Sequence, residues 1–230
     1  MSAFTLAIFL SVVLPQIPKE TVRCEESLIA GLALDDAGSR EDASALLNKA
    51  IELCSSPQSV AEKEALAKAH VRLGVFHFPA EPKEALEHFS KASDFDPHNQ
   101  IAALDLAATL TLLHRFNEAI SVAETAIAQG TDDHDLLGKL EYNAGYAMLN
   151  MCAAESARCD MARAEKHFLR SADLKSDFPG TYFSLAAISA SVHHDKRRAM
   201  DYMHKACDLG DSDACTRFEH FKTEVDGGGL

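Results

Sequence analysis

A spacing of small and apolar residues recurs about every 34 residues along this chain, and it is clearest in the stretch 100–133. Counted from Gln100, positions 7, 8 and 11 carry Leu106, Ala107 and Leu110. Positions 20, 24 and 27 carry alanine in each case. Residues three and four apart share one face of a helix, and small residues let two helices approach closely. The spacing therefore predicts a pair of antiparallel helices.

The same spacing predicts five helix pairs in succession, over the ranges 24–57, 59–99, 100–133, 134–178 and 179–211. Leu and Ala dominate the composition, and Gly and Pro stand mainly at the breaks, so we expect an all-α fold. Residues 21–225 should form one helical repeat domain. Its last helix, 212–225, is expected to cover the exposed end of the stack, and 226–230 to be a flexible tail.

This spacing resembles the tetratricopeptide repeat, a helix–turn–helix unit of 34 residues with small residues at positions 8, 20 and 27. The first and third predicted ranges keep the same register, and the second and fourth differ in their loops. Near the C-terminus, KACDLGDSDAC (205–215) resembles the cysteine-containing Sel1-like repeats. The resemblance implies a right-handed α-solenoid of about five antiparallel helix pairs with a C-terminal capping helix.

In the tetratricopeptide family the first helix of each pair lines a concave groove, mainly through positions 2, 5, 9, 12 and 13. Positions 5 and 9 of this chain give an apolar groove with aromatic rings towards its C-terminal half. The resemblance implies that the groove is lined by Leu28, Leu32, Val71, Val75, Leu104, Tyr142, Tyr146 and Phe183. The family's clamp for a peptide carboxylate is not matched, and its only candidates here are Lys68, Lys139 and Asn150.

Two cysteine pairs are consistent with this repeat register. Cys24 starts a first helix and Cys54 ends the second helix of the same pair, so the two side chains can meet. The chain reverses at Gly210–Asp211, between Cys207 and Cys215, and the spacing of these two cysteines resembles the bridge of Sel1-like proteins. We therefore expect disulfides at both places.

The remaining cysteines, Cys152 and Cys159, flank an extra stretch in the fourth repeat. On one continuous helix they would lie about 10 Å apart, beyond the ~4.4–6.8 Å between the Cα atoms of a disulfide. Their pairing therefore requires the chain to fold back. The alternative for all six cysteines is a set of buried thiols. They are spread over different repeats without a C-x2-C motif, so we expect no metal site.

The N-terminal stretch Met1–Pro15 is apolar and uncharged. It is shorter than the ~20 residues of a membrane-spanning helix and resembles the core of a secretory signal peptide. We predict that 1–20 is a signal peptide or apolar N-terminal segment of a secreted, periplasmic or lumenal protein, stabilised by disulfides. The alternative is a cytoplasmic protein in which this segment packs on the first repeat.

The formal net charge of -13 disfavours binding to nucleic acid or to anionic membrane surfaces. The sequence has no metalloprotease H-E-x-x-H, no P-loop and no G-x-S-x-G. These observations predict a non-enzymatic chain without a cofactor, namely a scaffold or adaptor that binds a protein or peptide in its groove. One alternative is a structural subunit or homo-oligomer with the groove buried, and a more distant one is a Sel1-like enzyme.

Overall fold

The structure is a computed structural model. It describes residues 19–36, 38–54, 57, 59–154, 159–174 and 177–227, without the side chains of 19–25, 36, 221 and 224–227. Its described part is helical and contains no strand, which confirms the all-α prediction. The helices are α1 (Lys19–Asp36), α2 (Arg40–Leu53), α3 (Val60–His77), α4 (Pro82–Phe95), α5 (Gln100–Leu112), α6 (Phe116–Gln129), α7 (His134–Ala154), α8 (Met161–Asp173), α9 (Pro179–Ser191), α10 (Lys196–Asp208) and α11 (Ser212–Gly227).

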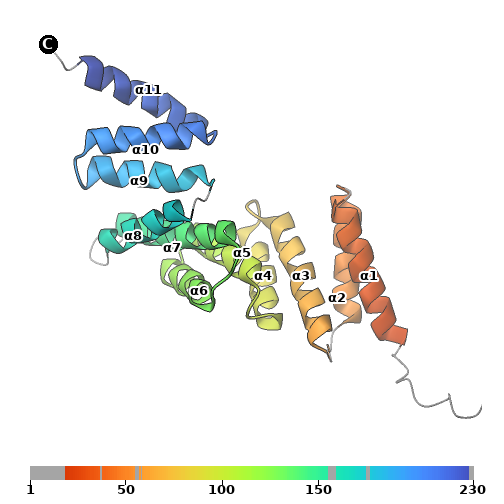
Figure 1. Ribbon diagram of the computed structural model, residues 1–230. Coiled ribbons are helices and arrows are strands. Elements are labelled where there is room, and N and C mark those ends of the chain that lie inside the picture. Colours follow the sequence, from red (N-terminus) through yellow and green to blue (C-terminus); the bar gives the residue numbers. More distant parts are fainter. Residues whose placement is uncertain are drawn as a thin grey trace, which may run out of the picture.

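Successive helices pack in pairs, and the pairs follow one another in a row (Figure 1). The strongest packing joins α1 to α2, α3 to α4, α7 to α8 and α9 to α10. First helices of successive pairs also contact each other: α1 contacts α3, α3 contacts α5, α5 contacts α7, and α7 contacts α9. The red and blue ends of the row lie far apart, as in a solenoid. The first helices therefore form one continuous layer.

Small residues allow this packing, because they stand where two helices approach most closely. The residues at repeat positions 8, 20 and 27 are all buried: Gly31, Ala43, Ala50, Gly74, Ala85, Ala92, Ala107, Ala119, Ala126, Gly145, Ala164, Ser171, Ala186, Ala199 and Ala206. A Cβ atom at Gly74 would lie 2.5 Å from the ring of Phe89 on α4. Larger side chains at such positions would force the two helices apart.

The helix ends follow local sequence signals. Ser59 accepts a hydrogen bond from the backbone N–H of Glu62, whose side chain accepts one from the N–H of Ser59. This reciprocal arrangement is a capping box. Pro82 begins α4, where its missing N–H costs nothing. Between α10 and α11, Gly210 has a φ of 95°, which a residue without a Cβ adopts without strain.

A polar network lies between α6, α7 and α8. Nδ1 of buried His167 lies 2.6 Å from Oε2 of Glu141, which is 4% exposed, and its Nε2 lies 3.2 Å from Oε1 of Glu124. Arg163 reaches Glu124 at 2.6 Å, and Arg170 lies 3.7 Å from Glu141. Buried carboxylates are stable only when they are paired. The network therefore joins these three helices through paired charges.

Two sequence predictions concern the chain ends, namely the N-terminal segment 1–20 and the capping helix 212–225. Of the predicted N-terminal segment 1–20, residues 1–18 lie outside the described part, and Lys19 and Glu20 belong to α1. The capping helix extends to Gly227, two residues beyond its predicted end. No helix within the described ranges is long and apolar enough to span a bilayer.

Candidate partner-binding groove

The layer of first helices has an apolar side that does not face the core, and α5 shows how this arises. Leu106 and Leu110 are buried against the neighbouring helices. Ile101, Asp105 and Leu112 follow the spacing of another helix face and line pockets at the surface. Ile101 is 53% exposed and Leu112 is 46% exposed. A helix with apolar residues on both sides can serve the core and an external contact together.

One pocket lies between α1, α3 and α5, and we call it the first pocket. Its volume is about 400 Å³. Four aliphatic side chains line it, among which Val75 is 45% exposed. It is lined by Leu32, Lys68, Val71, Arg72, Val75, Asn99, Ile101 and Asp105. It can therefore hold an aliphatic group beside charged side chains.

The charged side chains of the first pocket differ in their surroundings. Nη1 of Arg72 lies 3.3 Å from Oδ2 of Asp35. Lys68 is exposed. Burial raises the pKa of Asp105 from 3.8 to about 6. Among the described residues, the carboxylate of Asp105 has no hydrogen-bond or ion-pair partner.

A second pocket, between α3, α5 and α7, is rich in aromatic rings, and we call it the aromatic pocket. The rings of Tyr142 and Tyr146 stack with their centroids 5.5 Å apart. The rings of Tyr142 and Phe178 lie edge-on to each other, with their centroids 4.5 Å apart. Burial, and then Tyr146, raises the pKa of Tyr142, so its hydroxyl stays protonated at neutral pH. The pocket has a volume of about 400 Å³. It is lined by Phe78, Ala108, Thr111, Leu112, His114, Tyr142, Asn143, Tyr146, Asn150 and Phe178.

Side-chain amides at the aromatic pocket are oriented by the backbone. Asn143 donates from Nδ2 to the carbonyl of Leu104 at 2.9 Å, and Asn150 donates to the carbonyl of Tyr146 at 2.8 Å. Each amide keeps an acceptor oxygen and a second N–H. These groups offer hydrogen bonds to a ligand next to the rings.

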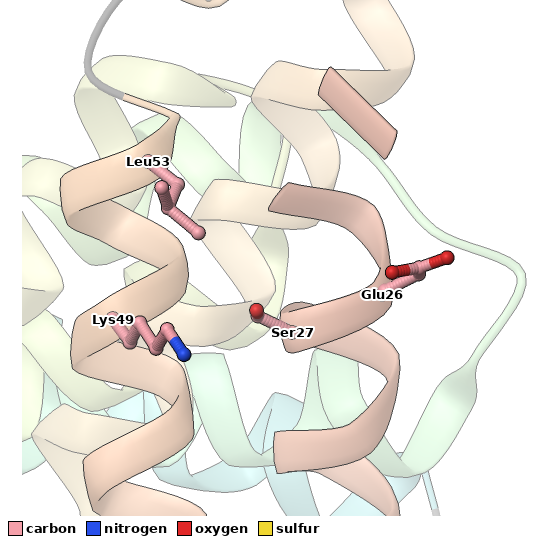
Figure 2. Close-up of a pocket in the computed structure, with 4 residues that line it drawn as sticks. All are labelled: Glu26, Ser27, Lys49 and Leu53. Carbon is pink, nitrogen blue, oxygen red and sulfur yellow. The ribbon is translucent and has the colours of Figure 1, made fainter. Parts of the chain in front are cut away.

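A third pocket, between α1 and α2, does not form a catalytic arrangement. It is lined by Glu26, Ser27, Lys49 and Leu53, with a volume of about 340 Å³. Figure 2 shows Ser27 and Lys49 facing each other across the gap between the helices, whereas Glu26 points away. Catalysis by a serine needs a base and an orienting group that converge on it. The three polar side chains here do not converge.

The structure places the predicted groove residues unevenly. Five of the eight line the two pockets: Leu32, Val71, Val75, Tyr142 and Tyr146. The placement of Leu28 is wrong, because this side chain is 2% exposed and packs in the core between α1, α2 and α3. Leu104 and Phe183 are half-buried and line neither pocket. The guanidinium of Arg217, from α11, lies 5.4 Å from the ring centre of Phe183.

Several pocket residues were not predicted. Ile101 and Leu112 occupy positions 2 and 13 of the third repeat, so the register could have identified them. Phe78 and Phe178 lie just outside the ends of first helices and carry no such signal. Of the clamp candidates, Lys68 and Asn150 line pockets, whereas Lys139 pairs with Asp135 at 2.6 Å.

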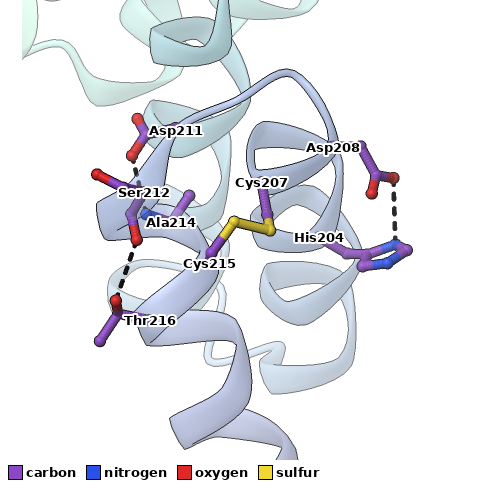
Figure 3. Close-up of a disulfide and its surroundings, with 8 residues drawn as sticks. All are labelled: His204, Cys207, Asp208, Asp211, Ser212, Ala214, Cys215 and Thr216. Carbon is purple, nitrogen blue, oxygen red and sulfur yellow. Dashed lines mark hydrogen bonds and ion pairs between the residues drawn. A yellow bond between two sulfur atoms is a disulfide. The ribbon is translucent and has the colours of Figure 1, made fainter.

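Disulfides stabilise the C-terminal half of the row. Cys207 and Cys215 are bonded, with their Cα atoms 4.6 Å apart, and join α10 to α11 (Figure 3). Asp211 caps α11 by accepting from the N–H of Ala214 at 2.9 Å. The structure thus contains this predicted bridge.

Of the other two cysteine pairs, the structure describes both side chains only for Cys152 and Cys159. Cys152 and Cys159 are bonded, with their Cα atoms 4.2 Å apart, and α7 ends between them, at Ala154. Cys54 is disulfide-bonded. The side chain of Cys24 lies outside the described residues, so the Cys24–Cys54 pairing stays a prediction. Within the described ranges, no group of three or more His, Cys, Asp and Glu residues is arranged to hold a metal ion.

Comparison with known families identifies the central repeats. Residues 80–141 match the family model of the tetratricopeptide repeat. This range runs from the start of α4 into α7 and includes the helix pair α5–α6. The tetratricopeptide resemblance is therefore confirmed, and the Sel1-like element stays a prediction. A comparison with curated protein sequences finds no significant match.

Solved structures of tetratricopeptide-repeat proteins share the fold. PilF of Pseudomonas aeruginosa is 20% identical, with a TM-score of 0.61 over 92% of this chain and 95% of that chain. YrrB, described as a protein of this type with an unusual peptide-binding site, is 18% identical, with a TM-score of 0.58 over 88% and 98%. MamA of Desulfovibrio magneticus RS-1 is 17% identical, with a TM-score of 0.58 over 83% and 98%. The chain thus has the tetratricopeptide α-solenoid fold along most of its length.

Proposed function

We propose that this chain, a helical-repeat protein of the tetratricopeptide type, is a non-catalytic scaffold that holds a segment of a partner protein in its groove. The observation that carries the proposal is the clustering of exposed apolar side chains. Of the eight large apolar residues exposed in the described part, five line the two pockets: Val75, Phe78, Ile101, Leu112 and Tyr146. Contiguous exposed apolar surface on a folded protein marks an interaction site.

The form of the groove favours an extended peptide segment as the ligand. Both pockets share α5, where Asp105 of the first pocket and Leu112 of the aromatic pocket lie seven residues apart. Seven residues of helix span about 10 Å, which about three residues of extended chain can cover. Asn143 and Asn150 offer hydrogen bonds at the aromatic pocket. YrrB, with the same fold, is described as having a peptide-binding site.

We place this scaffold in a secreted, periplasmic or lumenal compartment. The bridges Cys152–Cys159 and Cys207–Cys215 support this assignment, because disulfides persist in oxidising compartments and are rare in the cytosol. The apolar stretch Met1–Pro15 supports it independently as the core of an export signal.

A charge placed in the groove tests the proposal. Tagged wild-type chain, Tyr146→Lys and Ile101→Lys are each used to purify partners from the native compartment, with identification by mass spectrometry. Val60→Lys is the matched control, because Val60 is 72% exposed and lines neither pocket. We expect partners that co-purify with the wild type and Val60→Lys and are lost with both groove variants.

Light scattering during size exclusion separates the structural alternative from the scaffold. A wild-type monomer with an open groove agrees with the proposal. A stable dimer that dissociates in Tyr146→Lys and persists in Val60→Lys would instead mean that the groove is a subunit interface. Identical partner lists for all four proteins would contradict binding through this groove.

A further inference from the structure

Among the described residues, Asp105 has no partner that would favour its charged form. It lines the first pocket together with aliphatic side chains, among them Val75 and Ile101. Its main-chain carbonyl accepts a hydrogen bond from Oγ1 of Thr109 at 2.7 Å. Its carboxylate makes no hydrogen bond or ion pair with any described residue. A partly buried carboxylate without a partner destabilises the fold, so such groups are uncommon.

The two cations of the same pocket do not provide that partner. Arg72 is directed to Asp35, at 3.3 Å. Lys68 is exposed. Burial alone accounts for the raised pKa of Asp105, with no contribution from either cation. At neutral pH, above its pKa of about 6, the carboxylate is mostly ionised and available to a cation from outside the chain.

We infer that the first pocket accepts a lysine or arginine side chain from an extended segment of a partner protein, and that the ligand cation pairs with Asp105. The inference rests on the proposed function and specifies the chemistry of the ligand. The aliphatic stem of Lys or Arg lies well against apolar side chains such as Val75 and Ile101 while its charged end reaches the carboxylate. The net charge of -13 also attracts a basic partner.

The aromatic pocket sets the second feature of the ligand. Its lining includes rings and amides and no carboxylate. It suits an apolar side chain, which an extended segment can place there about three residues from the basic residue. The groove thus selects a basic and an apolar residue in close succession, with no requirement for a free carboxyl terminus.

A random library of displayed twelve-residue peptides, selected on the immobilised full chain, tests this inference. The proteins are the wild type, Asp105→Asn, and the control Asp94→Asn, which removes the same charge from an exposed position on α4. We expect the wild type and the control to enrich Lys or Arg at one aligned position, with an apolar residue about three positions away. Asp105→Asn should lose the basic preference and keep the apolar one.

Fluorescence anisotropy with the most enriched peptide then measures the pairing itself. Replacing its basic residue by norleucine should weaken binding to the wild type by about tenfold or more. The same replacement should have little effect on Asp105→Asn, whose folding is verified by its melting temperature. Equal losses with both proteins would overturn the inference, and the measurement on the wild type alone tests it if Asp105→Asn does not fold.

The outcomes separate this inference from the proposed function. Enriched apolar peptides without a basic position would leave the groove as a binding site and overturn the pairing with Asp105. Basic residues enriched equally on Asp105→Asn would also overturn it. If no peptide is enriched on any of the three proteins, the proposed peptide-binding function is itself contradicted.

Discussion

His70 lies between α3 and α4 with 2% of its surface exposed. Its Nδ1 is 3.0 Å from Nδ1 of His88, and its ring stacks on Phe95. Burial, followed by the charges of His88 and Lys91, lowers its pKa from 6.5 to about 4. The pKa of His88 is lowered by burial, then by His77 and Lys91, against a smaller opposing effect of Glu87.

A base whose pKa is lowered by folding binds protons more readily in the unfolded chain, so acid favours unfolding. The stability associated with His70 is therefore complete above pH 6.5 and is lost as the pH falls towards 4. We predict that this residue lowers the free energy of unfolding by about 1 kcal/mol between pH 7 and 5. Urea unfolding at both pH values should show a smaller decrease for His70→Asn than for the wild type.

His134→Asn is the control for this measurement, because His134 is exposed. It should keep the wild-type dependence on pH. If His70→Asn loses as much stability as the wild type between pH 7 and 5, His70 does not account for the acid sensitivity.

The effect of Asp105 on stability has the opposite sign to that of His70. Burial raises the pKa of this acid, so its ionised form destabilises the fold. We predict that Asp105→Asn raises the free energy of unfolding at pH 7 by about 1 kcal/mol. The gain should shrink between pH 6 and 4, as Asp105 of the wild type becomes protonated. Urea midpoints at pH 7 and 4 measure this difference. A destabilised Asp105→Asn at pH 7 would show that the carboxylate has a structural role.

Among the secondary-structure elements, α7 carries two tyrosines one turn apart that differ in their contacts. The ring centre of Tyr142 lies 4.5 Å from that of Phe178 and 5.8 Å from that of Phe168. Tyr146 is 41% exposed and stacks on Tyr142. Tyr142 therefore links α7 to α8 and to the start of α9, whereas Tyr146 presents one side to the aromatic pocket.

We predict that Tyr142→Ala costs about 3 kcal/mol of stability, as large-to-small changes in packed clusters do. Tyr146→Ala should cost less than about 1 kcal/mol, because much of its ring is already in contact with water. Thermal melting of the two variants measures this difference directly. Equal falls in melting temperature would mean that Tyr146 is also a packing residue, and would weaken its assignment to the groove.

The helix pairs could be predicted from sequence because their determinants are local. Ala107 and Ala119 are fully buried at the predicted contact of the third pair, where only small side chains fit. The groove is harder to predict, because spacing gives the side of a helix and not what covers that side. Leu28 and Val71 share a repeat position and both pack in core clusters, yet only Val71 also lines a pocket.

The end of α7 was predicted only approximately: the sequence predicts an extra stretch between Cys152 and Cys159, and α7 ends at Ala154. No Pro or Gly stands in 151–159, so nothing in the local sequence marks a helix stop there. The bridge between Cys152 and Cys159 nevertheless requires the chain to leave the helix, which it does after Ala154. The bridge is thus incompatible with one helix that continues from Cys152 to Cys159.

In the whole molecule, the bridge Cys207–Cys215 attaches the capping helix α11 to the last pair. We predict that replacing both cysteines by Ser increases hydrogen exchange across α11 and leaves the exchange of α3 and α4 unchanged. For the sequence separation of 8 residues, the chain-entropy model gives a loss of about 2–3 kcal/mol. Hydrogen-exchange mass spectrometry measures both effects.

The corresponding double replacement of Cys152 and Cys159 by Ser is the control for this prediction. It should leave exchange in α11 as in the wild type, because that bridge lies between α7 and α8. Unchanged exchange in α11 without Cys207–Cys215 would show that side-chain packing alone, including that of Ala214, holds the cap.

The row of helix pairs has a mechanical consequence. The principal contacts join consecutive helices or the first helices of neighbouring pairs, so no contact of this size links α1 to α11 within the described part of the chain. A force applied to the two ends therefore acts on the interfaces in series. Each repeat of about 34 residues would release roughly 12 nm of extended chain as it unfolds. The molecule should lengthen in separate steps under load, and a partner bound across several repeats would resist their separation.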